Sequence, residues 1–314
     1  MNILVTGGAG FIGSHVVDRY LADGHQVGVV DNLSTGRTEF VHPRARLYVV
    51  DIHDPRLREV FEAERPEVVN HHAAQAEVRR SVDDPAFDAQ VNVLGSLTLL
   101  TCCRDFGVGR VIYASTGGAV YGDTAVLPTP EEHPRRPASP YGISKLAVEH
   151  YLACWETLHG IKGIVLRYAN VYGPRQNPLG EAGVVAIFTH RLLRREPAII
   201  NGDGLQTRDY VYVEDVAEAN ARALERPEVS GVFNIGTGIE TSVQELFIRL
   251  RTAAGVTGEA RHGPAKPGEQ RRSALDCSAA KRLLGWTPAA TLDEGLRRTV
   301  EYFRDVRRSA EHEA

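Results

Sequence analysis

The chain has 314 residues, of which 43% are hydrophobic and 24% charged, and its formal net charge is -4 at pH 7. This composition is that of a globular protein with one large α/β domain or two lobes, and it excludes a disordered chain. The acidic charge and the lack of a Lys/Arg run argue against nucleic-acid binding, so any phosphate site has to be built locally.

The first half of the chain alternates short β-branched runs with helix-like segments. The predicted strands are Ile3–Thr6, Gln26–Asp31, Leu47–Asp51, Val68–Ala73, Arg110–Ser115 and Gly163–Arg167. The predicted helices are Phe11–Asp23, Arg56–Glu64, Asp88–Phe106 and Ser139–Leu158. Strands that alternate with helices form right-handed βαβ units, which predicts an α/β fold around a doubly wound parallel sheet.

The pattern changes after about Tyr172, where prolines and glycines open a loop-rich stretch. The elements predicted beyond it are the helix Val184–Arg195, a strand and turn over Ala198–Gly204, the strands Tyr210–Val213 and Val232–Ile235, and the helix Leu292–Phe303. The polar tail Arg307–Ala314 is predicted to be frayed. We expect a first domain over residues 1–170 with the chain returning at about 209–236, and a smaller α/β substrate-binding lobe over 171–208 and 237–314.

Cysteine and histidine spacing points away from disulfides and metals. The four cysteines, Cys102, Cys103, Cys154 and Cys277, show no CxxC spacing and are predicted to be reduced thiols of a cytoplasmic protein. The twelve histidines include no HxxxH or HExxH pattern, so no metal site is expected. We expect no signal peptide, because a β-like run follows Met1-Asn2 at once, and no apolar window long enough to span a membrane.

The strongest local signal is the run Gly7-Gly8-Ala9-Gly10-Phe11-Ile12-Gly13, which follows the first strand and opens a helix. Gly7 permits a tight turn, Gly10 lets backbone N–H groups approach a pyrophosphate, and Gly13 allows close packing of helix and strand. The anion then lies at a helix N-terminus, where unpaired N–H groups stabilise negative charge. This context predicts a dinucleotide-binding Rossmann domain.

Two acidic residues follow later strands of the predicted sheet. Asp31, at the end of the second strand, is placed to accept hydrogen bonds from the adenosine ribose, and its carboxylate favours NAD over NADP. Asp51 and Ile52, which end the third strand, lie where an adenine ring is expected. Asp51 could equally cap the helix that follows Pro55.

Tyr141 and Lys145 stand four residues apart at the start of a predicted helix, so their side chains share one helical face. A free tyrosine titrates near ~10 and is a poor base at neutral pH. A nearby ammonium and a cationic nicotinamide ring would lower the pKa of Tyr141 into a useful range. The pair is predicted to be catalytic.

These motifs together resemble the extended short-chain dehydrogenases, and among them most closely the UDP-glucose (UDP-galactose) 4-epimerases. The resemblance runs from Met1 to about Phe303. The segments that carry it are Gly7–Gly13, Asp31-Asn32-Leu33-Ser34, Ser115-Thr116 with Val120-Tyr121-Gly122, Tyr141 with Lys145, Leu166–Arg175 and Arg208-Asp209-Tyr210. It implies an NAD-dependent 4-epimerase that oxidises the sugar C4, rotates the 4-keto sugar, and returns the hydride to the other face.

The resemblance also implies roles for single residues. Tyr141 would be the acid/base on the sugar 4-hydroxyl, and Lys145 would orient the nicotinamide ribose. Tyr168 would lie near the nicotinamide carboxamide. The other residues that it implies at the cofactor are Asn32, Ala73, Ala74 and Asn92, although an asparagine in a helix is more often solvated or locally bonded.

One position departs from the family. The epimerases usually have Ser or Thr five residues before the glycine of Val-Tyr-Gly, and here that residue is Gly117. Thr116 is the nearest hydroxyl and is expected to replace it on the sugar 4-oxygen, with Ser115 next; the alternative is that Thr116 only satisfies the strand end. Gly117, Gly118 and Ala119 supply no acid of the kind that the related 4,6-dehydratases and decarboxylases carry there.

For the sugar nucleotide, the resemblance assigns Arg208 and Asn170 to the diphosphate, and the backbone around Ala198 and Ile200 to uracil. Lys266 stands where the family usually has a second arginine, and a point charge makes a looser contact than a bidentate fork.

Ser273 lies three residues before Asp276, where the family has a bulky tyrosine or a small residue beside the sugar C2 substituent. A small side chain predicts that UDP-N-acetylhexosamines are accepted as well as UDP-glucose. A surface serine without sugar contact is the alternative.

Three other readings stay open at this point. A UDP-glucuronate 4-epimerase would need a cation or hydroxyl cluster for the carboxylate. A net keto-sugar oxidoreductase would release its reduced cofactor, and a non-catalytic NAD-binding protein would have no use for Tyr141 and Lys145. The helices Asp88–Phe106 and Ser139–Leu158 resemble those that form the family's two-fold contact, which predicts a homodimer.

Overall fold

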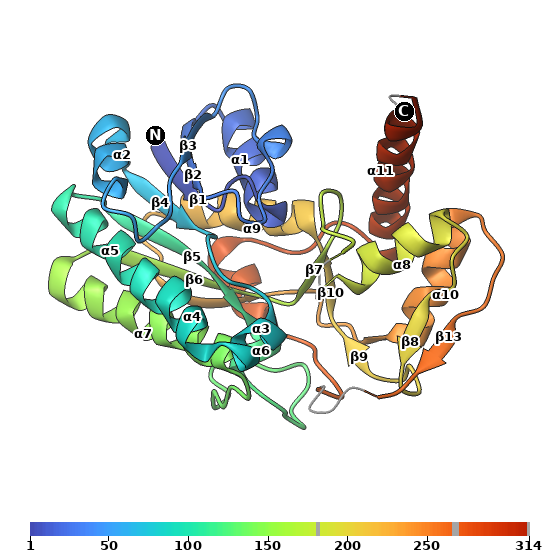
Figure 1. The fold of residues 1–314 in the computed structure, drawn as a ribbon. Helices are drawn as coiled ribbons and strands as arrows, with labels where there is room; N and C mark the ends of the chain where they lie inside the picture. Colours follow the sequence, from blue (N-terminus) through green and yellow to red (C-terminus); the bar gives the residue numbers. More distant parts are fainter. Residues whose placement is uncertain (180–182, 266–269, 313–314) are drawn as a thin grey trace.

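The structure is a computed structural model that describes residues 1–179, 183–265 and 270–312. Its centre is a seven-stranded sheet in the order β11-β6-β5-β4-β1-β2-β3 (Figure 1). Every neighbouring pair in this sheet is parallel. The strands are β1 (Asn2–Thr6), β2 (Gln26–Asp31), β3 (Arg46–Val49), β4 (Val68–His71), β5 (Arg110–Thr116), β6 (Lys162–Tyr168) and β11 (Gly231–Ile235). The predicted doubly wound parallel sheet is confirmed, because buried β-branched runs form these strands.

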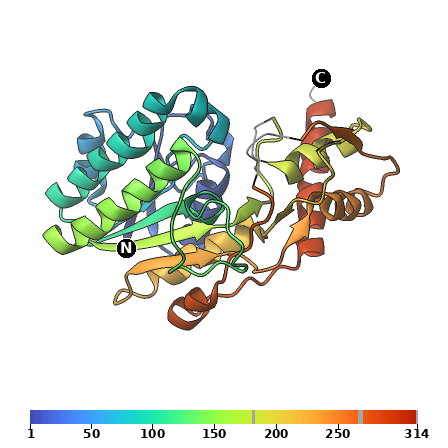
Figure 2. The same ribbon diagram turned by 90° about the horizontal axis from the view of Figure 1, so that it is seen from below.

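Helices cover both faces of the sheet (Figures 1 and 2). On one face, α1 (Phe11–Ala22) packs against α9 (Val213–Leu224), and their apolar side chains share one core cluster with β1, β5 and β6. On the other face, α2 (Leu57–Glu64), α5 (Gly95–Asp105) and α7 (Pro140–His159) bury a second cluster. Because the strands are all parallel, their carboxyl ends lie at the same edge of the sheet, and doubly wound folds bind ligands at this edge.

The helix predicted over Asp88–Phe106 differs in detail. It begins as α4 (Pro85–Ala89), continues through the π-helical turn η2 (Gln90–Leu94), and ends as α5. A separate helix α3 (Val78–Asp83) precedes it. Hydrophobic periodicity alone does not locate a π-turn, because the turn is defined by which backbone groups form hydrogen bonds in the folded chain.

The expectation that no apolar segment is long enough to span a membrane is wrong for one segment of the described residues, Pro85–Asp105. Its length and composition would allow it to cross a membrane, and 44% of its most apolar 18-residue window is buried inside the fold. Its buried side packs against α2 and α7, so its apolar residues belong to the core of the domain.

The chain leaves the sheet after β6 and builds a second lobe of helices and short strand pairs. Its described helices are α8 (Val184–Leu193), α10 (Val243–Ala254) and α11 (Leu292–His312). Outside the central sheet, β10 (Tyr210–Tyr212) pairs with β7 (Asn170–Tyr172), β12 (Thr241–Ser242) with β9 (Thr207–Arg208), and β13 (Arg261–Gly263) with β8 (Ile199–Asn201). Two short helices, η1 (Thr38–Phe40) and α6 (Gly117–Val120), and the π-turn η3 (Ala280–Leu284) complete the described elements.

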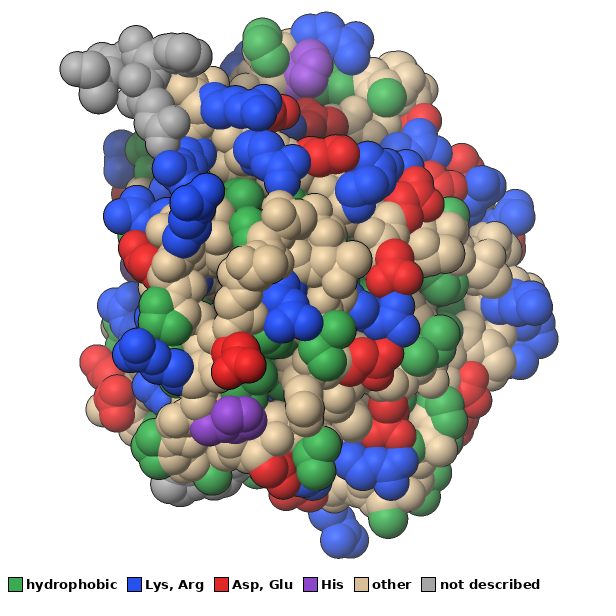
Figure 3. Space-filling model, turned by 90° about the vertical axis from the view of Figure 1, so that its right-hand side faces the viewer, with side chains coloured by type: hydrophobic (Ala, Val, Ile, Leu, Met, Phe, Trp, Pro, Cys, Tyr) green, Lys and Arg blue, Asp and Glu red, His purple; other side chains and the backbone are tan. Residues whose placement is uncertain are grey.

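The frayed tail predicted from Arg307 is wrong, since α11 continues to His312. Arginine and glutamate are good helix formers, and ion pairs at i,i+4 spacing, such as Arg297 with Glu301, support the exposed face. Figure 3 shows the side of the molecule that carries this lobe, where Lys/Arg and Asp/Glu side chains are interspersed.

Candidate active site

The glycine-rich turn joins β1 to α1. Gly7 has a φ of 69°, a left-handed conformation that glycine adopts without strain. A Cβ on Gly13 would lie 2.2 Å from the carbonyl oxygen of Gly7, so only glycine lets the helix pack this closely. α1 begins at Phe11, and its N-cap Gly10 has no side-chain cap. The amides of Phe11 and Ile12 can therefore bind an anion at the helix N-terminus.

Asp31 ends β2 beside this turn. Its carboxylate accepts hydrogen bonds from the backbone N–H groups of Ala9 at 3.0 Å and Leu33 at 2.9 Å. The side chain is buried, and burial raises the pKa of Asp31 above its usual value. These two bonds hold the carboxylate at the ligand-binding edge of the sheet, as the predicted ribose contact requires.

Asn32 and Asp51 are bonded to each other, with 2.7 Å between Asn32 Nδ2 and Asp51 Oδ2. Asp51 also pairs with His53 Nδ1 at 2.7 Å. The alternative role of Asp51 as a helix cap is wrong, because α2 begins at Leu57 and its N-cap is Arg56. Asp51 thus belongs to the loop between β3 and α2.

The remaining predicted cofactor residues lie along the same edge. Ile52 is buried in the core beside α5, and Ala73 and Ala74 follow β4. Asn92, in the π-turn, is 2% exposed and bonds both backbone groups of Gln75, each at 2.9 Å. The solvated half of the alternative for Asn92 is therefore wrong, whereas the locally bonded half is confirmed, since Asn92 Nδ2 also donates to Asp88 Oδ1 at 3.0 Å. The amide of Asn92 thus joins the loop after β4 to the helix.

Tyr141 and Lys145 share the first turns of α7, as their spacing predicts. Ser139 caps this helix by accepting the N–H of Gly142 at 3.2 Å. Lys145 is 4% exposed, and its Nζ donates to the carbonyl oxygen of Ala114 in β5 at 3.0 Å. The same Nζ lies 5.9 Å from the centroid of the Tyr141 ring.

Burial dominates the proton affinities of this pair. It lowers the pKa of Lys145 to about 8, against the opposing charges of Asp88 and Glu149. It raises the pKa of Tyr141, and the charge of Asp88 acts in the same direction. The lowered pKa expected for Tyr141 is therefore not found in the chain by itself, because desolvation and the charge of Asp88 both raise it.

Gly117 and its neighbours form the end of β5 and the short helix α6. A Cβ built on Gly118 would lie 3.8 Å from Thr116 Oγ1 and 4.0 Å from Asn170 Oδ1. The Thr116 hydroxyl and the side chain of Asn170, the first residue of β7, therefore both border the space beside Gly118. The hydroxyl of Ser115, the second choice, donates instead to the buried carboxylate of Glu149 and is directed away from this space.

Tyr168, the last residue of β6, is buried in the core cluster between the sheet and the helices α1 and α9. It is 5% exposed, and its hydroxyl accepts a hydrogen bond from Asn220 Nδ2 at 2.9 Å and lies 3.2 Å from His72 Nε2. The His72 ring stacks on it with centroids 6.1 Å apart. This contact fixes the tyrosine beneath the carboxyl end of β4.

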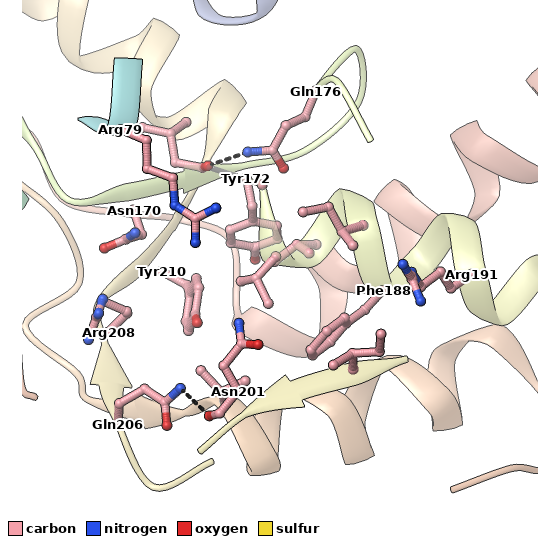
Figure 4. A pocket seen from close by; sticks show the side chains of 17 residues that line it. Arg79, Asn170, Tyr172, Gln176, Phe188, Arg191, Asn201, Gln206, Arg208 and Tyr210 are labelled. Carbon is pink, nitrogen blue, oxygen red and sulfur yellow. Dashed lines mark hydrogen bonds between the residues drawn. The ribbon is translucent and has the colours of Figure 1, made fainter. Parts of the chain in front are cut away.

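A cavity of about 380 Å³ opens between the sheet edge and the second lobe. Figure 4 shows side chains from both halves of the chain that point into it: Arg79, Asn170, Tyr172, Gln176, Phe188, Arg191, Asn201, Gln206, Arg208 and Tyr210. Arg208 in β9 and Asn170 in β7 both line this cavity. Gln206 Nε2 donates to the Asn201 carbonyl oxygen at 3.1 Å and closes one wall.

Successive side chains point to opposite sides along residues 198–201, the segment that is expected to contact uracil. Ala198 and Ile200 are each 1% exposed and pack into the core of the second lobe. Ile199 and Asn201 instead line the cavity. The side chains of Ala198 and Ile200 therefore do not face the ligand space, because neighbours along a strand point to opposite sides.

Ser273 and Lys266 come from the C-terminal part of the second lobe. Ser273 is 6% exposed, so the alternative of a surface serine is wrong. It precedes Ala274, whose carbonyl oxygen accepts the N–H of Thr129 at 2.8 Å, which joins this segment to the loop before α7. Lys266 lies outside the described residues.

Sequence reasoning missed Arg79, which reaches the cavity from α3. The signal was a basic pair, Arg79-Arg80, shortly after the carboxyl end of β4, where doubly wound folds bind ligands. Asn201 and Gln206 carried no comparable signal, since turn-rich segments hold many polar residues.

The comparisons with known proteins agree with this geometry. The profile of the NAD dependent epimerase/dehydratase family matches residues 3–236. A UDP-glucose 4-epimerase of Thermotoga maritima, solved with UDP-glucose, is 52% identical over 98% of this chain and 99% of its own, with a TM-score of 0.94. The Thermus thermophilus UDP-glucose 4-epimerase, solved with NAD, is 46% identical over 97% and 99%, with a TM-score of 0.93.

A curated relative extends the match to another bacterial group. The UDP-glucose 4-epimerase of Mycolicibacterium smegmatis is 47% identical over 310 residues, which cover 97% of this chain and 99% of the relative. The profile match over residues 3–236 spans most of the chain, including the glycine-rich turn and the Tyr141–Lys145 pair. The chain is therefore a member of the NAD dependent epimerase/dehydratase family.

Proposed function

We propose that the chain is an isomerase that catalyses NAD-dependent 4-epimerisation of a UDP-hexose through a transient 4-keto intermediate. The observation that carries the proposal is the position of β5. Lys145 is anchored to this strand at Ala114, and Thr116, two residues on, borders the space beside Gly118 together with Asn170 of the sugar-nucleotide cavity. An acid/base pair thus adjoins a site with the cations that a diphosphate needs.

The residues present fit NAD as the cofactor. The uncapped N-terminus of α1 suits a pyrophosphate, and the close packing at Gly13 leaves no side chain in its way. The Asp31 carboxylate suits a ribose and repels a 2′-phosphate. The other residues proposed for the cofactor site are Asn32, Asp51, Ile52, Ala73, Ala74, Asn92 and Tyr168. NAD bound by these residues would supply reversible hydride transfer at the sugar C4.

The side chains of the chain handle the proton and the 4-oxygen. Tyr141 takes the proton of the sugar 4-hydroxyl as the C4–H bond breaks, and gives it back when the other epimer forms. Lys145 stabilises the phenolate electrostatically. Thr116 donates a hydrogen bond to the sugar 4-oxygen, the role that Gly117 leaves empty.

The second lobe is proposed to hold the UDP moiety. Arg208 of β9 and Asn170 of β7 bind the diphosphate, and Lys266 adds a second cation. The backbone near Ala198 and Ile200 binds uracil. The domain division proposed for this is residues 1–170 with 209–236 for NAD, and 171–208 with 237–314 for the nucleotide sugar.

UDP-glucose/UDP-galactose is the proposed substrate pair, with UDP-GlcNAc/UDP-GalNAc as a second. The small side chain of Ser273 supports the second pair by leaving room at the sugar C2. Replacing Ser273 by Tyr is expected to lower kcat/KM for UDP-GlcNAc at least about tenfold more than for UDP-glucose. The tyrosine ring would fill the space beside the sugar C2, which excludes the N-acetyl group but not the smaller hydroxyl. Equal loss for both sugars would show that Ser273 is remote from C2.

A UDP-glucuronate 4-epimerase is the second candidate. It is favoured by Arg79, a further cation in the cavity whose guanidinium suits a carboxylate (Figure 4).

A homodimer is proposed as the assembly. Exposed apolar side chains line the outer sides of η2 and α7, where Leu94 is 57%, Ile143 57% and Leu158 65% exposed. A two-fold contact between these helices would bury them. Analytical ultracentrifugation tests this, and a Leu158→Glu variant is expected to shift the sedimentation to the monomer.

The proposed location is the cytoplasm. All four cysteines, Cys102, Cys103, Cys154 and Cys277, are free thiols in the structure, as in proteins of reducing compartments. Fractionation of the native cells tests the location.

The experiment that tests the function is an assay of the purified chain without added cofactor. Interconversion of UDP-glucose and UDP-galactose without net growth of NADH absorbance is expected, with Tyr141→Phe at least about a hundredfold slower. Turnover of UDP-glucuronate alone would favour the second candidate. Steady release of reduced cofactor would make the chain a keto-sugar oxidoreductase, and bound NAD without turnover a binding protein.

A further inference from the structure

Asp88 is a fully buried carboxylate behind the catalytic helix, and the proposed chemistry gives it no role. It is 0% exposed and lies in α4. Its Oδ1 accepts hydrogen bonds from Gln75 Nε2 and Asn92 Nδ2, both at 3.0 Å. Its Oδ2 accepts one from Ser144 Oγ at 2.6 Å. Three segments therefore meet at one carboxylate: the loop after β4, the π-turn η2 and the first turns of α7.

All three donors are uncharged. Within residues 1–179, 183–265 and 270–312, Asp88 forms no ion pair with a Lys, Arg or His. The hydrogen bonds stabilise the carboxylate, but they leave its negative charge uncompensated at close range in a buried region of low dielectric. Such a charge acts on other buried groups nearby.

The groups that it acts on are the two catalytic candidates. Ser144, which donates to Asp88, is the neighbour of Lys145 in the chain. The charge of Asp88 opposes the burial of Lys145 more strongly than that of Glu149 does, and it raises the pKa of Tyr141. Glu149 is neutralised by a buried ion pair with Arg167. Of the two carboxylates that act on the Tyr141–Lys145 pair, Asp88 is thus the one without an ion pair among the described residues.

The other titratable groups around Lys145 come from three elements: His71 and His72 of the β4 end, Tyr113 of β5, and Tyr141 and Glu149 of α7. Burial lowers the pKa of both histidines, that of His72 to about 3, and raises that of Tyr113. Near neutral pH these three groups are uncharged, so they do not compensate Asp88.

We propose that Asp88 is a positioning residue of the active site, whose carboxylate, held by Gln75, Asn92 and Ser144, places a buried negative charge behind the Tyr141–Lys145 pair and keeps Lys145 charged. The effect on the Lys145 charge needs only the fold. The consequence for turnover rests on the proposed 4-epimerase function.

Asp88→Asn separates charge from geometry. The amide oxygen of the introduced side chain can keep the bonds from Gln75 and Asn92, and the Ser144 hydroxyl can turn to accept from the new NH₂ group. Removing the negative charge favours the deprotonated form of both Lys145 and Tyr141, so both titrations are expected to move to lower pH by about one unit. Ser144→Ala is the matched control, since it removes one hydrogen bond and keeps the charge.

Lys145 can be followed directly, without any assay of activity. The chain has four lysines, Lys145, Lys162, Lys266 and Lys281. Carbon-13 labelling at the lysine Cε and a Lys145→Arg variant therefore identify its NMR signal. We expect the titration midpoint of Lys145 to fall in Asp88→Asn and to stay at the wild-type value in Ser144→Ala and in Asp88→Glu, which keeps the charge.

The pH–rate profile provides the second readout. Both limbs of the profile are expected to move to lower pH in Asp88→Asn, whereas a purely structural role would lower the rate at every pH alike. Asp88→Ser serves as a second neutral variant if Asp88→Asn does not fold. An unmoved Lys145 titration in a folded neutral variant overturns the inference. A moved titration in a chain without epimerase activity overturns the proposed function instead.

Discussion

A Cβ on Gly117 would lie 2.4 Å from Cδ1 of Leu275, a side chain that is 1% exposed. The hydroxyl residue usual at this position of the family would therefore have to displace the side chain of Leu275. We expect Gly117→Ser to lower the free energy of unfolding by about 1–3 kcal/mol through overpacking. Urea unfolding measures this loss.

Gly118→Ser is the matched control, because the nearest atoms to its Cβ would be 3.8 and 4.0 Å away. It should unfold near the wild-type urea concentration. Gly117→Ser combined with Leu275→Ala should recover part of the loss. Wild-type stability of Gly117→Ser alone would mean that Leu275 moves aside at no cost.

Thr116 is expected to supply the hydroxyl that Gly117 cannot carry. Replacing it by Ala removes one hydrogen bond to the developing charge on the sugar 4-oxygen, so kcat should fall about a hundredfold while KM changes little. Thr116→Ser keeps the hydroxyl and should retain most of the rate. Steady-state kinetics with UDP-galactose decide the point, and a fully active Thr116→Ala variant would assign the contact to another group.

The buried Lys145 predicts a pH dependence of stability. Its pKa in the folded chain, about 8, lies below the usual 10.5. The unfolded chain therefore binds more protons between these two values, and the free energy of unfolding rises as pH increases through this window. Below pH 8 the cost of burying the ammonium is fully present, on the order of 3 kcal/mol.

Lys145→Met removes this group and should lack the rise. Urea unfolding at pH 7 and pH 10, compared between the two proteins, isolates the contribution of Lys145 from those of other groups. Parallel pH profiles for the wild type and Lys145→Met would contradict a lowered pKa.

Arg208 and Arg79 approach the cavity from opposite halves of the chain (Figure 4). Each Arg→Gln variant is expected to raise the KM for the UDP-sugar about ten- to a hundredfold, since a charge-assisted contact is worth roughly 1.5–3 kcal/mol. NAD content should stay unchanged. Arg297→Gln, on the exposed face of α11, is the control for the loss of one positive charge. An unchanged KM in Arg79→Gln would leave Arg208 as the main cation for the diphosphate.

Several features follow from local sequence. The glycine-rich turn, Asp31 and the strands of the central sheet were predictable because turn geometry and burial constrain residue types over a few neighbouring positions. The spacing of Tyr141 and Lys145 likewise determines that they share a helical face. The helical continuation of α11 to His312 was missed, because polar composition was taken to outweigh helix propensity.

Other features depend on contacts between distant segments. Tertiary packing decides that Gly117 meets Leu275, that Arg79 reaches the cavity of the second lobe, and that the charge of Asp88 lies behind Lys145. The sequence alone thus determined the doubly wound fold, the dinucleotide turn and the catalytic pair, since those signals are local. Only the tertiary structure decided the raised pKa of Tyr141 and the lining of the cavity, because desolvation and long-range charge depend on what the folded chain places around each group.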